Sequence, residues 1–169
     1  MTSNSRAMRT RIILIRHGET AWNLERRIMG HADLQLNDMG RCQADDLCDA
    51  LQYTDIEAIY ASPLSRARET AACIARCHPV PIQFDDGLKE LDVGEVDGLT
   101  SQQAMQTHGE FLKRWRTDLT VRVPGGESVP ELQERAWAAI ERIRDRHPQG
   151  TVLVVSHNMA ILAILCRAM

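Results

Sequence analysis

The sequence lacks any apolar run long enough to cross a membrane, and its first ten residues contain no apolar core of signal-peptide type. It also lacks internal repeats, low-complexity stretches and linkers. A formal net charge of −3 over 169 residues gives no reason to expect nucleic acid or an anionic membrane as a partner. These absences predict one cytoplasmic domain over residues 11–169, preceded by a disordered lead-in over residues 1–10.

Cysteine is sparse, and its pattern excludes two common kinds of site. The five cysteines are odd in number and include no Cys-x-x-Cys pair. Cys73 and Cys77 are one turn apart on a predicted helix and could share a face. The pattern favours reduced thiols in a cytosolic protein over a disulfide framework or a zinc site.

What the sequence does contain is a series of apolar runs that alternate with helical patterns. The predicted strands cover residues 12–15, 56–60, 80–84 and 151–155, and prolines at 79 and 81 place the third at a sheet edge. Helices are expected over residues 37–52, 66–75, 100–118 with a break at Gly109, and 128–146, with an apolar helix after residue 158. Residues 19–36 read as a polar loop. The alternation predicts a three-layer α/β/α sandwich with a mostly parallel central sheet.

The helix over residues 128–146 has the clearest local signals. Ser128 and Glu131 form a capping-box pattern at its start. The residues expected on its inward face are Leu132, Ala136, Ala139, Ile140 and Ile143.

Two predicted strands end in similar polar clusters. The first is followed by His17-Gly18 after Arg16, and the last by His157-Asn158 after Ser156. Because ligands of open α/β sheets bind past the carboxyl ends of the strands, the two histidines are expected to converge.

Further polar residues are expected at the same edge of the sheet. Arg66 lies in the first turn of the helix that follows Ser62, where both the helix N-terminus and the guanidinium favour an anion. The acidic loop over residues 87–98 could overhang this edge. Arginines would repel a metal ion, so the composition indicates a phosphate site and no metal.

The residues that carry these signals resemble the histidine phosphatase superfamily, also called the phosphoglycerate mutase-like family. The resemblance runs from Ile12 to about Leu165. Its landmarks in this chain are Arg16-His-Gly-Glu-Thr20, Trp22-Asn23, Gly30-His31, Leu36-Asn37-x-x-Gly40, Ser62-Pro-Leu-Ser-Arg66-Ala-x-x-Thr70, Leu88-x-Glu90, Pro124-Gly-Gly-Glu-Ser128 and Val155-Ser-His157.

The resemblance implies a role for each of six residues. His17 would attack phosphorus and carry the phosphoryl group as phosphohistidine. Arg16, Asn23, Arg66 and His157 would surround the phosphoryl oxygens, and His157 is counted with the catalytic residues. Glu90 would protonate the leaving alcohol and then take a proton from water. No cofactor is implied.

The other candidates have structural interpretations beside these. His31 either touches substrate or shapes its loop, and His78, His108 and His147 are expected to be exposed at element ends. Asp92, Glu95 and Asp97 match Glu90 in chemistry, so only the family register selects Glu90.

The sequence departs from the family pattern at two points. Asn158 stands where many relatives have glycine after the histidine. The chain also stops at Met169 inside a predicted helix, whereas relatives usually continue with another strand, so an edge of the sheet is expected to be uncovered.

The resemblance leaves several functions open. The compact segment between Glu90 and His157 favours the phosphatase branch, which includes alpha-ribazole phosphatase and broad-specificity phosphatases, over a phosphoglycerate mutase. A catalytically weak phosphate-binding domain is a further alternative. The expected partner is a small phosphorylated substrate, and a homodimer stays open.

Overall fold

The computed structural model describes residues 9–169 and contains a parallel sheet of four strands in the order β1-β4-β2-β3. The strands are β1 (Arg11–Arg16), β2 (Ala58–Ala61), β3 (Ile82–Phe84) and β4 (Thr151–Ser156). The two inner strands, β2 and β4, are almost wholly buried. Their uninterrupted apolar runs are typical of strands that are covered on both faces.

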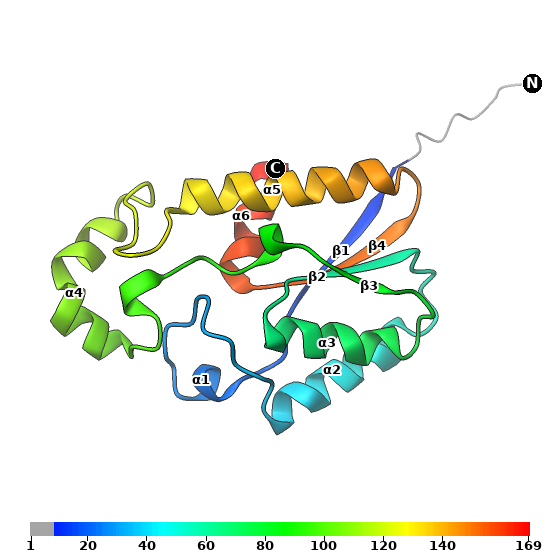
Figure 1. Ribbon diagram of the computed structural model, residues 1–169, viewed down its shortest axis with the longest axis horizontal. Coiled ribbons are helices and arrows are strands. Elements are labelled where there is room, and N and C mark those ends of the chain that lie inside the picture. Colours follow the sequence, from blue (N-terminus) through cyan, green and yellow to red (C-terminus); the bar gives the residue numbers. More distant parts are fainter. Residues whose placement is uncertain (1–8) are drawn as a thin grey trace, which may run out of the picture.

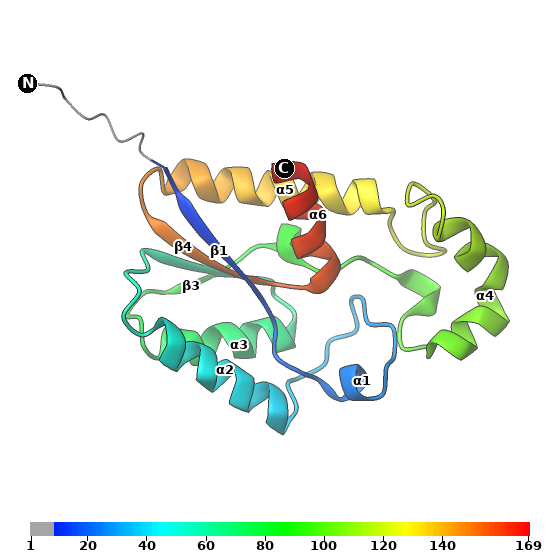
Figure 2. The same cartoon turned by 180° about the vertical axis from the view of Figure 1, so that it is seen from behind.

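Helices cover both faces of this sheet (Figure 1, Figure 2). On one face lie α2 (Asp38–Leu51) and α3 (Ser65–Ala75), and on the other lie α5 (Val129–Arg146) and α6 (Asn158–Ala168). Alternate strand residues divide between the two core layers: Ile59 and Leu153 pack toward α3, whereas Tyr60 and Val154 pack toward α5. The predicted three-layer α/β fold is confirmed.

Helix α5 follows its sequence signals closely. Ser128 caps it, with the side chain of Glu131 bonding back to the Ser128 backbone in a capping box. The five residues expected on its inward face are all buried: Leu132, Ala136, Ala139, Ile140 and Ile143. Burial of this stripe therefore sets which face of α5 packs against the sheet, as predicted.

The segments at the carboxyl ends of the strands are less regular. The loop expected over residues 19–36 contains a one-turn helix, α1 (Ala21–Leu24), and the acidic loop contains the 3-10 turns η1 (Asp86–Leu88) and η2 (Gly94–Val96). Helix α4 (Ser101–Trp115) is kinked at His108, one residue before the predicted break. A third apolar cluster, which includes Ala104 and Leu132, joins α4 to the rest of the molecule.

Both edges of the sheet follow the sequence expectations. β3 is an edge strand, as its flanking prolines predict. Among the described residues, β1 pairs only with β4, and Ile12, Ile13 and Leu14 are half-buried. The edge of β1 is therefore uncovered in the part of the chain that the structure describes.

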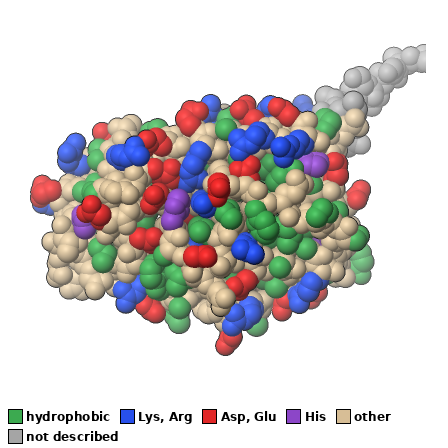
Figure 3. All heavy atoms as spheres, in the orientation of Figure 1, with side chains coloured by type: hydrophobic (Ala, Val, Ile, Leu, Met, Phe, Trp, Pro, Cys, Tyr) green, Lys and Arg blue, Asp and Glu red, His purple; other side chains and the backbone are tan. Residues whose placement is uncertain are grey.

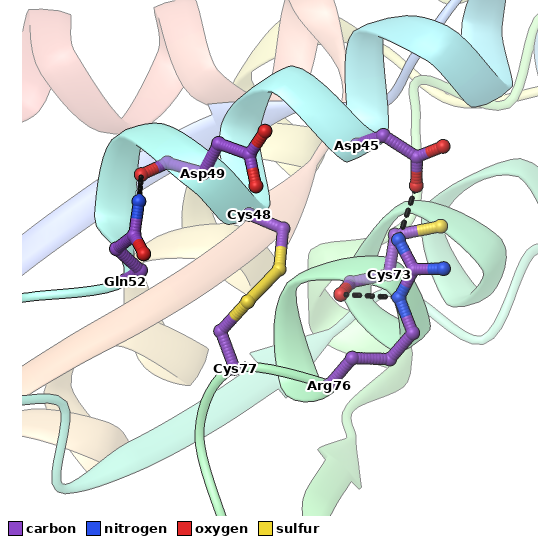
Figure 4. Close-up of a disulfide and its surroundings, with 7 residues drawn as sticks. All are labelled: Asp45, Cys48, Asp49, Gln52, Cys73, Arg76 and Cys77. Carbon is purple, nitrogen blue, oxygen red and sulfur yellow. Dashed lines mark hydrogen bonds and ion pairs between the residues drawn. A yellow bond between two sulfur atoms is a disulfide. The ribbon is translucent and has the colours of Figure 1, made fainter.

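The prediction of reduced thiols is wrong for two of the five cysteines. Cys48 of α2 and Cys77, just after α3, form a disulfide with a Cα–Cα distance of 6.2 Å (Figure 4). Spacing along one helix relates Cys73 to Cys77, whereas the bond joins α2 to the end of α3 across a sequence separation of 29 residues. Cys42, Cys73 and Cys166 are free, and burial raises the pKa of the Cys73 thiol.

Reduction of this disulfide should lower the free energy of unfolding by roughly 3–4 kcal/mol, because the bond closes a loop of about thirty residues in the unfolded chain. Urea unfolding with and without dithiothreitol measures the change. Cys42→Ser supplies the control, since this exposed free thiol should leave both curves unchanged. A midpoint that reductant does not move would contradict the expectation.

Three histidines that were expected to be exposed are not. His78 is buried, and His108 and His147 are half-buried. His147 bonds to the Tyr60 hydroxyl and to Glu57, which draws it against the sheet. Position beside proline or glycine was therefore a poor guide to exposure.

The predicted lead-in falls largely on residues 1–8, which lie outside the described residues. Thr10, at its end, donates from its hydroxyl to the His147 carbonyl at 2.7 Å. None of the helices within residues 9–169 has the length and apolar content needed to cross a bilayer. Positive and negative side chains are interspersed over the face seen in Figure 3.

Candidate active site

The register of the sheet brings three polar strand ends together. Arg16 of β1 lies opposite Ser156 of β4, and the His17 amide donates to the Ser156 carbonyl. On the other side of β4, the Ser62 amide donates to the Val155 carbonyl. The rings of His17 and His157 are consequently 5.1 Å apart between centroids, so the predicted convergence of the two histidines is confirmed.

His17 is held in a defined tautomer. Its Nδ1 lies 2.7 Å from the Gly18 carbonyl oxygen, which can only accept, so Nδ1 carries the proton. Nε2 is left with a lone pair. Burial, together with the positive charges of Arg66 and Arg16, lowers the pKa of His17 from 6.5 to about 4, although the bond to Gly18 acts in the opposite direction. The imidazole of His17 is thus neutral at and well below neutral pH.

The turn after His17 requires glycine for close packing. A Cβ on Gly18 would lie 2.4 Å from the Gly40 carbonyl oxygen, and one on Gly40 would lie 2.1 Å from the Glu19 carbonyl oxygen. The Gly18 amide also donates to the Thr70 hydroxyl of α3 at 3.0 Å. The N-terminal end of α2 and one face of α3 therefore fix the backbone that carries His17.

The two predicted phosphate-binding arginines differ in their surroundings. Arg16 is exposed and lines the open pockets beside His17. Arg66 is fully buried, and its guanidinium donates to the carbonyls of Ala32 and Gly30 at 2.8 and 2.7 Å. Its Nε has no partner among the described residues. Arg66 thus ties the loop around residues 30–32 to α3 and keeps one buried donor unused.

Asn23 lines the same pockets as Arg16 and His17. Its side-chain oxygen accepts from the Thr20 amide and hydroxyl, both at 3.0 Å, as part of the capping box of α1. The amide NH₂ group is left as the donor that the pocket can use.

His157 lies wholly inside the protein. Its Nε2 is 2.8 Å from the Ser62 hydroxyl oxygen, and its Nδ1 is buried without a partner among the described residues. Burial first, and then the charge of Arg66, lowers the pKa of His157 well below its ordinary value. It is therefore a neutral hydrogen-bonding group.

Glu90 is the one acid of its loop that reaches the site. Its carboxylate accepts from the amides of Leu91, Ala160 and Met159 at 2.8, 3.2 and 3.2 Å. It takes the place of the side-chain cap that α6 lacks at His157. Burial raises the pKa of Glu90 although these bonds act in the opposite direction. A raised pKa suits a group that must donate a proton.

The competing acids are engaged elsewhere. Asp97 accepts from the amides of Gly30 and Ala32, Asp92 accepts from the Gly94 amide, and Glu95 faces His108. Of the four acids in this loop, Glu90 is the one that lines the pocket with His17, and its acid role stays a prediction.

Two residues support the Glu90 loop, and sequence reasoning missed the first of them. The guanidinium of Arg135 on α5 donates to the carbonyls of Gly87, Lys89 and Glu90. The Nε2 atom of His31 is 2.8 Å from the Glu90 carbonyl, so this histidine shapes the loop, one of its two predicted roles. An arginine beside an apolar helix stripe has no sequence signal that separates it from a solvated one.

Two pockets open beside His17. One, of about 280 Å³, is lined by Arg16, His17, Asn23, Glu19 and Gln43. The other, of about 260 Å³, adds Glu90, Asn158 and Arg27 to an apolar wall. That wall consists of Ile28, Met29, Leu91, Val93, Trp115 and Met159. Arg66 and His157 are absent from both linings because they are fully buried, with the His157 ring next to that of His17. Within residues 9–169, no group of three His, Cys, Asp or Glu is placed to hold a metal ion.

The pKa shifts predict the pH dependence of kcat/KM. The predicted nucleophile role of His17 requires a neutral imidazole, so the acid limb should fall near pH 4 instead of 6.5. The predicted acid role of Glu90 requires a protonated carboxyl, so the rate should fall as pH rises through its raised pKa. Glu90→Gln should remove the alkaline limb and leave the acid limb in place. Rate profiles on a phosphomonoester measure both, and an acid limb near pH 6.5 would contradict the assignment of His17.

Folding stability has its own pH dependence. Circular dichroism at each pH therefore has to show whether a fall in rate comes from unfolding. The pKa of His17 is lower in the folded chain than in the unfolded chain, so the unfolded chain binds protons more readily between these values. The stability that neutral His17 contributes is present above about pH 6.5 and is lost as the pH falls toward 4.

Fold and site together define an α/β protein whose strand ends gather two neutral histidines, two arginines and a buried acid, a set suited to phosphoryl groups. Residues 12–169 match the histidine phosphatase superfamily, branch 1. The chain belongs to this superfamily, as the resemblance predicted, and is a phosphoric monoester hydrolase.

Particular relatives cover most of the chain. Phosphoglycerate mutase-like protein 4 of Arabidopsis thaliana is 40% identical over 161 residues, 93% of this chain and 70% of that protein. Phosphoserine phosphatase 1 of Hydrogenobacter thermophilus is 34% identical over 157 residues, 92% of this chain and 74% of that protein. The structure of alpha-ribazole phosphatase from Shigella flexneri matches with a TM-score of 0.85 at 27% identity, covering 92% of this chain and 78% of the other.

Proposed function

We propose that this chain hydrolyses small phosphomonoesters through a phosphohistidine intermediate on His17. The observation that carries the proposal is the orientation of His17, whose Nδ1 is held by the Gly18 carbonyl while Nε2 keeps its lone pair. Burial beside Arg66 and Arg16 keeps the imidazole neutral. A neutral imidazole next to arginine side chains is the arrangement that nucleophilic attack on a phosphate monoester needs.

In the first step, Nε2 of His17 forms a bond to phosphorus as the bond from phosphorus to the leaving oxygen breaks. Arg16, Asn23, Arg66 and His157 donate to the phosphoryl oxygens, where negative charge is concentrated. Protonated Glu90 gives its proton to the departing alkoxide. The alcohol leaves, and the phosphoryl group stays on His17.

In the second step, water attacks the phosphorus of phosphohistidine. Glu90, now a carboxylate, takes a proton from the water as its oxygen bonds to phosphorus and the bond to Nε2 breaks. Inorganic phosphate leaves, His17 is neutral again, and Glu90 is protonated for another cycle.

The apolar wall of the second pocket supports a phosphatase over a mutase. Ile28, Trp115 and Met159 lie where the alcohol part of a substrate would fit beside Glu90. A phosphoglycerate mutase must hold a carboxylate there. Besides Arg16, which is assigned to the phosphoryl group, this pocket is lined by Arg27, whose guanidinium already bonds to Glu25 and to the Gly98 carbonyl. Arg27 is also the observation that keeps a mutase as the second candidate.

A panel of phosphomonoesters tests this function, together with 3-phosphoglycerate in the presence of 2,3-bisphosphoglycerate. We expect phosphate release from the monoesters and little interconversion of phosphoglycerates. Interconversion that exceeds phosphate release would establish the mutase. Phosphate binding without turnover of an aryl phosphate would establish a binding domain instead.

A homodimer is a further proposal, which sedimentation measurements test. We also propose a cytoplasmic location. The location rests on the sequence. A cytoplasmic location implies that Cys48 and Cys77 are reduced in the cell, whereas persistence of the Cys48–Cys77 disulfide of the structure would count against it. Alkylation of thiols at the moment of cell lysis shows whether Cys48 and Cys77 are reduced or disulfide-bonded in the cell. All five cysteines are alkylated if the compartment keeps them reduced, and only Cys42, Cys73 and Cys166 if the disulfide persists there.

A further inference from the structure

The side chain of Ser62 is hydrogen-bonded to His157. It follows β2 directly and is fully buried. Its hydroxyl oxygen lies 2.8 Å from His157 Nε2 and 3.3 Å from the Leu64 amide nitrogen. Its backbone amide donates to the Val155 carbonyl, which fixes Ser62 to the strand that carries His157. The hydroxyl is thus anchored on both sides.

Counting donors and acceptors determines which way this bond runs. The Leu64 amide can only donate, so the Ser62 oxygen accepts from it. The Ser62 proton has no acceptor among the described residues other than His157 Nε2. A buried hydroxyl proton without an acceptor costs free energy, so Ser62 donates to Nε2. The proton of neutral His157 then belongs on Nδ1.

The Nδ1 atom of His157 is one of the few buried polar atoms without a partner in the described chain, and Arg66 Nε is another. Buried donors of this kind normally have partners, so the missing partner is best sought in a ligand. Both groups lie behind His17, close enough to shift its pKa or to contact its ring. These two buried N–H groups beside His17 are therefore suited to donate to one phosphoryl group.

We infer that Ser62 is a positioning residue for the reaction: its hydroxyl selects the His157 tautomer in which Nδ1–H donates to the phosphoryl group. The inference rests on the proposed function, because the acceptor is the phosphate that His17 attacks. The two histidines then have opposite tasks. His17 presents a lone pair to phosphorus, and His157 presents a proton to oxygen. The other tautomer of His157 would turn a lone pair toward an anion, which is repulsive.

The test combines a tautomer measurement with kinetics on three variants. Proton–nitrogen correlation spectra of the unliganded protein should show His157 protonated at Nδ1 and bare at Nε2. Ser62→Ala should mix the two tautomers and lower kcat about tenfold. Ser62→Thr keeps a hydroxyl, so it should have the wild-type tautomer of His157 and the wild-type kcat. KM should change less than kcat, since the bond to His157 matters most when charge develops on the phosphoryl oxygens.

Ser156→Ala is the matched control. Ser156 is also fully buried at a strand end, but its hydroxyl donates to the Leu88 carbonyl at 2.7 Å. This variant should lose stability without changing the tautomer of His157. Wild-type His157 protonated at Nε2, or Ser62→Ala with wild-type tautomer and kcat, would overturn the inference. The spectra need no substrate, so they distinguish failure of the Ser62 inference from failure of the phosphohistidine pathway. If Ser62→Ala does not fold, the His157 tautomer of the wild-type protein tests the inference by itself.

Discussion

Replacing His17 with alanine should lower kcat on phosphomonoesters roughly 10⁴-fold or more, because among the described residues His17 is the one imidazole that lines the two pockets. Arg16 and Arg66 carry no lone pair for attack, and Glu90 is held by three backbone amides. His157 is protonated on the nitrogen that would face phosphorus. Turnover measured on an aryl phosphate, with a correction for contaminating phosphatases, gives the size of the effect.

A matched control for this variant is His108→Ala. His108 is half-buried like several other histidines, but it lies at the kink of α4 and faces Glu95. Its replacement should leave kcat within about twofold of wild type, a difference of a few tenths of a kcal/mol. Substantial turnover by His17→Ala, in a protein that binds phosphate normally, would remove His17 from the nucleophile role.

Glu90→Gln should affect substrates according to their leaving groups. An alkoxide must be protonated as it departs, whereas nitrophenolate needs little help. We therefore expect kcat to fall roughly 10²-fold or more on an alkyl phosphate and much less on a nitrophenyl phosphate. Glutamine can keep one oxygen toward the amides of Leu91 and Ala160, so the cap on α6 should largely survive. Parallel assays on the two substrates measure the difference.

The neighbouring acids give the comparison for Glu90. Asp92 bonds to the Gly94 amide and Glu95 faces His108, so neither reaches the leaving group. Asp92→Asn and Glu95→Gln should slow both substrates slightly and equally. Equal losses on the two substrates for Glu90→Gln, or a selective loss for either neighbour, would transfer the acid role to another residue.

The sequence predicted most of the fold because its strongest signals are local and agree with one another. The apolar run of β4 and the inward stripe of α5 each show which residues must be buried. Alternating strands and helices then restrict the sheet to a few parallel topologies. The histidines could be placed for the same reason: both follow strands directly, and parallel strands align their carboxyl ends.

Features that depend on packing between distant segments were not predictable in this way. The Cys48–Cys77 bond requires knowing that α2 and α3 lie side by side at a particular offset. The burial of His78 and the reach of Arg135 to the Glu90 loop likewise follow from tertiary contacts. The choice of Glu90 over Asp92 came from the family register, because the loop sequence gives four carboxylates and no period that orients them.

The central claim is that phosphorus becomes bonded to Nε2 of His17 during turnover. Rapid acid-free quenching of the enzyme with a phosphomonoester, followed by peptide mass spectrometry and phosphorus NMR, tests it directly. The account predicts an acid-labile, base-stable phosphoryl group on His17, attached at Nε2 because Nδ1 is engaged by the Gly18 carbonyl. A phosphoryl group at Nδ1, on another residue, or turnover with no phosphoenzyme at any quench time would contradict the account.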